Sequence, residues 1–177
     1  MRKVLYILGQ LNDTDVAWMG QSGRKMTLRP GDRLIQEGRE TPDLFIVLDG
    51  QVDVQVAGVG TVASLSSGEI LGEMSFVDKA PPSATVIAAR QTRVLALEKA
   101  LIEERLGSQP DFAARFYKAL AIFLADRLRT TTLRKSTSGA TTGTAEDELD
   151  DMVLDGVSMA GLKFQQLLSL LESAREA

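Results

Sequence analysis

A series of short β-type segments separated by glycine-containing turns, from about residue 24 to residue 98, most constrains the fold of this chain. Apolar and polar residues alternate most clearly at Val52, Val54 and Val56, whose neighbours are Gln51, Asp53 and Gln55. This period of two is typical of strands with one buried face. The segment therefore predicts several short antiparallel strands.

The turn residues between these segments support the same interpretation. Pro30 and Gly31 suit the central positions of a type II turn. Asp49 and Gly50 suit a type I′ hairpin turn, and Gly58 and Gly60 flank another reversal. So many tight turns in a short stretch favour a small barrel or jelly roll.

Helices are expected on both sides of the strands. Asn12 or Asp13 is suited to cap a short helix that runs through Trp18 and Met19. After the strands, we expect a short helix over 99–105 and a long helix over about 110–133. Ser108, Pro110 and Asp111 predict the start of this long helix. Its predicted apolar face consists of Phe112, Phe116, Leu120, Phe123, Leu124 and Leu128.

The rest of the chain predicts a linker and one further helix. Residues 136–157 begin with a run of small polar residues and continue into an acidic run, which predicts a flexible acidic linker. In 158–177, the residues Ala160, Phe164, Leu167, Leu168 and Leu171 lie at helical spacing, which predicts an amphipathic docking helix. We assign residues 1–135 to one domain, with its barrel over about 20–98.

Composition excludes several function classes. The chain of 177 residues has no Cys and no His, which argues against thiol and His-based catalysis, the usual zinc sites, iron–sulfur clusters and His-ligated haem. We therefore expect neither an enzyme nor a metal or haem protein. No apolar run approaches the roughly 20 residues of a membrane span, and we expect a cytoplasmic protein without a signal peptide.

Charge argues against nucleic acid as a partner. Residues 136–177 hold eight acidic residues against two basic ones, a balance that would repel a phosphate backbone. The four cations near the end of the long helix, Arg127, Arg129, Arg134 and Lys135, are explained by a solvated helix terminus alone.

The sequence GEMSF, residues 72–76, is the candidate ligand site. Gly72 lets the backbone approach a ligand closely, and the N–H groups of the helix start after it favour an anion. Glu73 is suited to accept hydrogen bonds from sugar hydroxyls. Two alternatives remain open, because Gly72 is also an ordinary turn residue and Glu73 also complements a helix dipole.

Three stretches resemble the cyclic nucleotide-binding domain family of catabolite activator proteins, gated channels and protein kinase A regulatory subunits. They are LRPGDRLIQEG, LFIVLDGQVDV and GEILGEMSFVDKAPPSATVIA, and the resemblance covers roughly residues 10–133. It implies a mainly β fold, an eight-stranded jelly-roll barrel with flanking helices, and a phosphate-binding cassette over 72–86.

The resemblance also implies roles for individual residues. The positions of Gly72, Glu73 and Met74 match the cassette's short helix, and Glu73 would hold the ribose 2′-OH. The backbone N–H of Ala84 would contact the cyclic phosphate. Thr131 and Thr132 lie near where some bacterial members contact adenine.

Ser83 departs from the family pattern, because binding members have a phosphate-pairing arginine there. Losing that contact should cost about 1.5–3 kcal/mol. The hydroxyls of Ser83 and Thr85 would recover part of it, and Lys79, Arg90 or Arg93 are further candidate cations. Ser83 also fits a solvated or backbone-bonded serine.

We therefore expect a stand-alone bacterial sensor or adaptor that binds a cyclic nucleotide, cAMP or cGMP, and signals to a protein partner through the long helix or the C-terminal helix. The alternative is a degenerate barrel that binds no ligand and acts as an interaction module. A homodimer through the long helix is expected by family likeness. DNA binding is not expected, because the segment after residue 135 is short and acidic where the family's transcription factors carry a winged helix.

Overall fold

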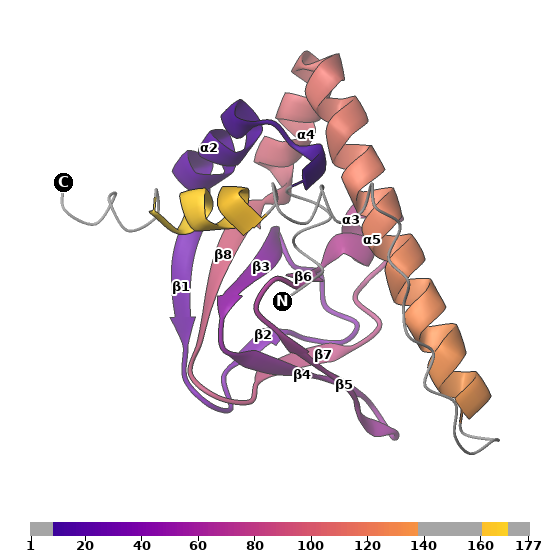
Figure 1. The fold of residues 1–177 in the computed structure, drawn as a ribbon. Coiled ribbons are helices and arrows are strands. Elements are labelled where there is room, and N and C mark those ends of the chain that lie inside the picture. The colour runs from indigo at the N-terminus through magenta and orange to yellow at the C-terminus, as the bar shows by residue number, and fades with distance from the viewer. Residues whose placement is uncertain (1–8, 138–160, 170–177) are drawn as a thin grey trace.

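The structure is a computed structural model that describes residues 9–137 and 161–169, with the side chains of residues 130–137 excepted (Figure 1). Within these ranges the β-domain has eight strands: β1 (Arg24–Leu28), β2 (Arg33–Ile35), β3 (Asp43–Asp49), β4 (Gln51–Val56), β5 (Gly60–Ser66), β6 (Ile70–Leu71), β7 (Thr85–Ala88) and β8 (Thr92–Glu98). The helices are α2 (Asp13–Ser22), α3 (Glu73–Val77), α4 (Lys99–Ser108), α5 (Pro110–Thr137) and a short helix over 161–169.

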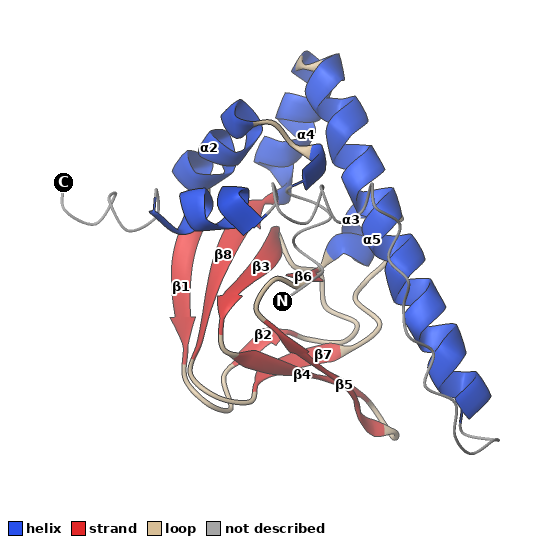
Figure 2. Ribbon diagram, in the orientation of Figure 1, coloured by secondary structure: helices blue, strands red, loops and turns tan. Residues whose placement is uncertain are grey.

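The strands form two four-stranded antiparallel sheets, in the orders β1-β8-β3-β6 and β2-β7-β4-β5. Figure 2 shows the helices gathered at one end of the strands, with α5 running past α3 along one side. The predicted mainly β jelly-roll fold with flanking helices is confirmed in this arrangement.

Two hydrophobic cores meet at β3, which explains why six of its seven residues are buried. Phe45 and Val47 point into the core between the two sheets, together with Val52 and Val54 of β4. Leu44, Ile46 and Leu48 face a second core beneath the helices. A strand that is covered on both faces reads as a continuous apolar run, as the sequence LFIVL does.

Two of the predicted turns are confirmed. The N–H of Asp32 donates to the carbonyl of Arg29 over 3.0 Å, and Gly31 has a φ of 89°, as a type II turn requires. Strands β4 and β5 pair as an antiparallel hairpin, with glycines of positive φ at Gly58 and Gly60.

The predicted hairpin at Asp49–Gly50 is wrong. Strands β3 and β4 lie in different sheets, so Gly50 forms a corner where the chain changes sheet. Gly50 has a φ of 104°, and a Cβ there would lie 2.5 Å from Oγ1 of Thr92. The N–H of Gln51 donates to that hydroxyl over 3.0 Å. Glycine is therefore required by the close approach of β8, for which the dipeptide alone carries no signal.

The N-terminal cap of α2 is confirmed at Asn12. Its side chain accepts the N–H of Asp15, and the carboxylate of Asp15 accepts the N–H of Asn12, which forms a reciprocal capping box. The predicted cap of α5 at Ser108 is wrong, because Ser108 is the last residue of α4. Its hydroxyl donates to the carbonyls of Glu104 and Arg105 and so satisfies the end of that helix.

The apolar face of α5 packs on the second core over its first half. Phe112, Phe116, Leu120 and Phe123 are buried, and Leu124 is partly buried against the same core. Leu128 was assigned to this face, but it is 68% exposed. Figure 1 shows that the second half of α5, to which Leu128 belongs, diverges from the strands.

The helix over 161–169 contacts the same core. Leu167 is fully buried there, and Phe164 and Leu168 are partly buried. The ammonium group of Lys163 donates to the carbonyl of Leu11, which ties this helix to the segment before α2. Ala160 and Leu171, which were assigned to the same apolar stripe, lie outside the described residues.

A buried carboxylate joins three helices. Asp15 of α2 accepts hydrogen bonds from Arg115 of α5 over 2.8 and 3.2 Å and from Arg105 of α4 over 3.2 Å. The guanidinium group of Arg105 lies 4.5 Å from the ring centroid of Trp18 and 4.6 Å from that of Phe112. This cluster fixes where the first half of α5 lies relative to the other helices.

Candidate functional site

The candidate site begins at the turn into α3. Gly72 precedes this helix with a left-handed φ of 83°, and a Cβ there would lie 3.2 Å from the carbonyl oxygen of Asp43. A side chain is disfavoured by both facts. The glycine therefore sets the direction in which the chain passes from β6 into α3, which begins at Glu73.

A pocket of about 490 Å³, part of it open to solvent, lies between α3, the sheet of β4 and β7, and α5. Its apolar wall contains Ile35, Val54, Leu71, Met74, Pro82, Ala84 and Val86. Its polar side chains are those of Glu73, Ser75, Ser83 and Arg127. A largely apolar pocket with a few polar groups is the usual form of a small-molecule site.

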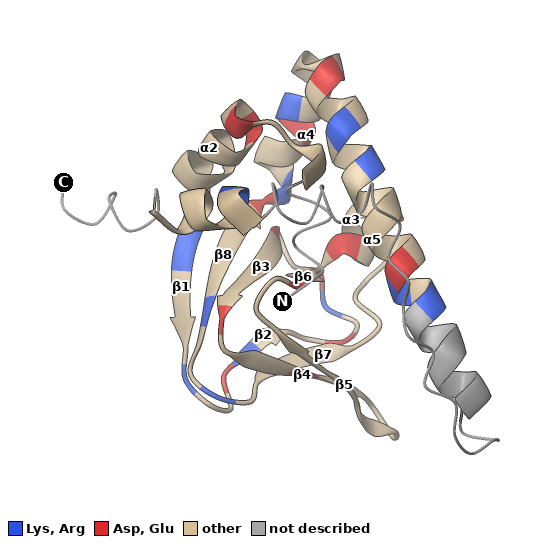
Figure 3. Ribbon diagram, in the orientation of Figure 1, with Lys and Arg blue, Asp and Glu red and all other residues tan. Residues whose placement is uncertain are grey.

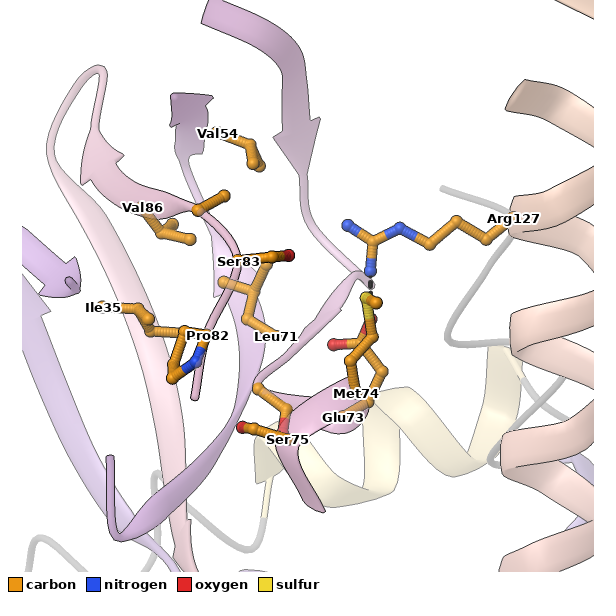
Figure 4. A pocket seen from close by; sticks show the side chains of 12 residues that line it. Ile35, Val54, Leu71, Glu73, Met74, Ser75, Pro82, Ser83, Val86 and Arg127 are labelled. Atoms are coloured by element: carbon orange, nitrogen blue, oxygen red, sulfur yellow. Dashed lines mark hydrogen bonds and ion pairs between the residues drawn. The ribbon is translucent and has the colours of Figure 1, made fainter. Parts of the chain in front are cut away.

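Glu73 and Arg127 form an ion pair across this pocket, from α3 to α5 (Figure 4). The side chain of Glu73 is only 3% exposed and that of Arg127 is 27% exposed. Burial raises the pKa of Glu73, although the charge of Arg127 opposes this shift. Arg127 also lies 5.8 Å from the ring centroid of Phe123, one turn earlier in α5.

Most of the predicted site residues come together in the pocket. Gly72, Glu73, Met74, Ser83 and Ala84 all line it, with Met74 half exposed.

Of the predicted site residues whose side chains the structure describes, Thr85 is not among those that line the pocket. Thr85 begins β7, and its hydroxyl accepts the N–H of Glu37 over 3.1 Å. Thr131 and Thr132 belong to α5, but their side chains lie outside the described part of the chain.

The three other candidate cations lie elsewhere. Lys79 pairs with Glu103, Arg90 donates to the carbonyl of Gly50 over 3.2 Å, and Arg93 pairs with Asp49 over 3.6 Å. None of the three is among the residues that line this pocket.

Arg127 is the functional residue that sequence reasoning missed, because it was interpreted as one of several solvated cations at the end of the helix. It follows Phe123 by four residues, so it lies on the apolar face of α5 rather than on its polar face. The signal that the sequence offered was a cation at helical spacing from the aromatic residues of the predicted apolar face.

Residues 25–108 match the family model described as the cyclic nucleotide-binding domain. Among curated proteins, the cAMP-dependent protein kinase regulatory subunit of Eremothecium gossypii is 29% identical over 105 residues, covering 59% of this chain and 23% of that protein. The Pycsar effector protein XpPycTIR of Xanthomonas perforans is 30% identical over 106 residues, covering 59% of this chain and 35% of that protein. The match thus spans about a quarter to a third of the length of these relatives.

A crystal structure of a cyclic nucleotide-binding domain from Methylobacillus flagellatus KT has the same fold. It superposes with a TM-score of 0.69 and 24% sequence identity, covering 81% of this chain and 85% of that one. This part of the chain therefore has the fold of that domain, and its residues 25–108 match the cyclic nucleotide-binding domain model.

Two kinds of feature are absent from the described residues. None of their helices has the length and apolar character to cross a lipid bilayer. No group of three or more carboxylate-bearing residues in the same ranges is arranged to hold a metal ion.

Proposed function

We propose that this chain is a regulatory sensor that binds a cyclic nucleotide, cAMP or cGMP, and reports its presence through the position of α5. The observation that carries the proposal is the ion pair between Glu73 and Arg127, which joins the cassette to α5 inside the pocket. The relatives support the ligand class, because several are named as cAMP-dependent kinase regulatory subunits.

The pocket offers a group for each part of such a ligand. The carboxylate of Glu73 accepts hydrogen bonds from the ribose hydroxyl, and the backbone N–H of Ala84 and the hydroxyl of Ser83 face the phosphate. Arg127 supplies the positive charge that Ser83 lacks. The apolar wall around Val54, Leu71 and Val86 receives the ring system.

Binding would change the contact between α3 and α5. A ribose hydroxyl and a phosphate compete for the same groups that now satisfy each other, so the pair must rearrange when a ligand enters. Any ligand that interacts differently with the two arrangements shifts the population between them. The first half of α5 is held by the cluster around Asp15, so a rearrangement of the pair between Glu73 and Arg127 would act on the part of α5 around Arg127.

The output would be a protein contact. Tyr117 and Leu128 are large exposed side chains on α5, and Leu162 is exposed on the helix over 161–169. We propose that a partner protein or a second copy of the chain binds α5 or this C-terminal helix, in the cytoplasm and without catalysis.

A second candidate function is a domain that binds no ligand and serves only for protein interaction. Ser83 favours it, because the cassette offers no cation at that position. The ion pair between Glu73 and Arg127 also favours an interaction domain, since each charge in the pocket already has a partner.

Calorimetric titration with cAMP and cGMP separates the two candidates. The sensor predicts saturable binding to the wild type and an affinity at least about tenfold weaker in Arg127→Met, because a charge-assisted contact is lost. Arg129→Met is the matched control, since Arg129 is exposed on the same helix. The absence of binding by either nucleotide would favour the interaction module. Equal binding by wild type, Arg127→Met and Glu73→Gln would instead refute the roles proposed for Arg127 and Glu73.

A further inference from the structure

A second pocket lies behind the cassette helix. Its volume is about 460 Å³ with its open mouth, and it is lined by Glu40, Thr41, Ser75, Lys79, Ala80, Pro82 and Lys99. Two of these residues, Ser75 and Pro82, also line the first pocket, so the two spaces share a wall (Figure 4). None of the contacts proposed above for a cyclic nucleotide involves a residue that lines only this second pocket.

Lys99 is the central polar group of this second pocket. It begins α4 directly after β8 and is only partly exposed. Its ammonium group donates to the hydroxyl of Ser75 over 2.9 Å, and that hydroxyl donates to the carbonyl of Gly72 over 3.2 Å. In the part of the chain that the structure describes, Lys99 forms no ion pair with a carboxylate.

The charges around Lys99 do not fully offset the free-energy cost of burying its ammonium group. Burial lowers the pKa of Lys99, and the nearby charge of Lys79 lowers it further, while Glu103, Glu40 and Asp43 act in the opposite direction. A partly buried ammonium group that is held by one hydroxyl is costly to keep charged. An anion in the pocket would remove this cost.

Lys79 supplies a second cation that is able to turn toward a ligand. Its side chain is 64% exposed, and its pair with Glu103 is an exposed one, which is weakly held. Glu40 is exposed on the same pocket and is free to turn into solvent. Figure 3 shows that basic and acidic residues both occur along α4, the helix that Lys99 begins.

We propose that this second pocket binds a small phosphate-bearing anion between Lys79 and Lys99. Two ammonium groups supply charge, and the hydroxyl of Thr41 supplies a further donor for an oxyanion with several acceptor oxygens. The inference goes beyond the nucleotide sensor and does not depend on it.

An anion at this site would also act on the first pocket. Ser75 is bonded to Lys99 on one side and to the carbonyl of Gly72 on the other, so a ligand that draws Lys99 away changes the hydrogen bonding at the entry to α3. The amide signals of Gly72 and Glu73 should therefore shift on anion binding, although neither residue lines the second pocket.

The test is a titration of the full chain with inorganic phosphate at constant ionic strength, followed by amide NMR spectra and calorimetry. We expect saturable binding and a dissociation constant raised at least about tenfold in Lys99→Gln, with a smaller rise in Lys79→Gln. Lys118→Gln is the matched control, since Lys118 is exposed on α5. A parallel titration with glycerol phosphate distinguishes free phosphate from a phosphate group carried by a larger molecule.

Three results would overturn the proposal. The first is no saturable binding of either probe to the wild type. The second is an equal loss in Lys118→Gln, which would mean a general charge effect. The third is a loss of phosphate binding in Arg127→Met with no loss in Lys79→Gln or Lys99→Gln, which would place the anion in the first pocket. Lys79→Gln keeps the test valid if Lys99→Gln fails to fold, because Lys79 is exposed.

Discussion

Replacing Asp15 by Asn should strongly destabilise the fold, because it removes a buried charge. The substitution changes almost no volume, so the loss of stability reports on the charge. Asp15 is 1% exposed and pairs with Arg105 and Arg115 of the next two helices. The side chain of Arg105 is only 10% exposed and lies close to the rings of Trp18 and Phe112, so most of it is shielded from solvent.

The expected loss is about 3 kcal/mol in the free energy of unfolding. Breaking a buried ion pair typically costs about 3–5 kcal/mol. The lower end applies here, because the side chain of Arg115 is 33% exposed and is able to turn into water after the substitution. An asparagine can still accept the N–H of Asn12, so the helix cap contributes little to the loss.

Urea denaturation of wild type and variant at neutral pH measures this loss. Asp13→Asn is the control, since Asp13 is exposed in the first turn of the same helix and should cost no more than about 1 kcal/mol. Equal destabilisation by the two substitutions would refute the reasoning.

The pH dependence of the same loss gives a second check. Burial alone would raise the pKa of Asp15, but the hydrogen bonds from Arg115 and from the N–H of Asn12 outweigh it and hold the pKa below 3.8. A lowered pKa in the folded state stabilises the fold above 3.8, and this contribution disappears as the pH falls through the folded-state pKa. The difference between wild type and Asp15→Asn should therefore shrink in acid.

Three further predictions concern the pocket. Ser83→Arg should tighten cyclic nucleotide binding by about 10- to 150-fold in calorimetry, and an unchanged affinity would mean that position 83 does not face the phosphate. Gly72→Ala should lower the thermal midpoint by an amount that corresponds to about 1–2 kcal/mol, because φ is 83° and the carbonyl of Asp43 is 3.2 Å away. Gly107→Ala in α4, where a Cβ meets nothing within 4 Å, should not lower it. The raised pKa of Glu73 means that the folded state keeps its proton longer, so this residue costs stability as the pH rises above 4.5. Glu73→Gln should remove that part of the pH dependence in thermal melts recorded from pH 4.5 upward, and an unchanged profile would contradict the assignment.

The sequence alone determined the features that depend on neighbours along the chain. The alternation at Val52 and Val54 predicted the buried face of β4, and Pro30–Gly31 predicted the type II turn between β1 and β2, because both features are set by local backbone geometry. Gly72 and Glu73 were found in the same way, as a turn glycine followed by an acid at a helix start. Family resemblance then supplied the jelly roll that joins these pieces.

Only the tertiary structure decided which distant groups meet. Glu73 and Arg127 are 54 positions apart, and their contact depends on how far α5 extends and how it is rotated against the β-domain. Gly50 looked like a hairpin glycine, but it forms a corner between sheets because β8 passes beside it. The packing also put Lys99 behind the cassette beside Ser75. Local patterns report the conformation of a few residues, whereas these contacts follow from the packing of whole elements, on which a local pattern has no bearing.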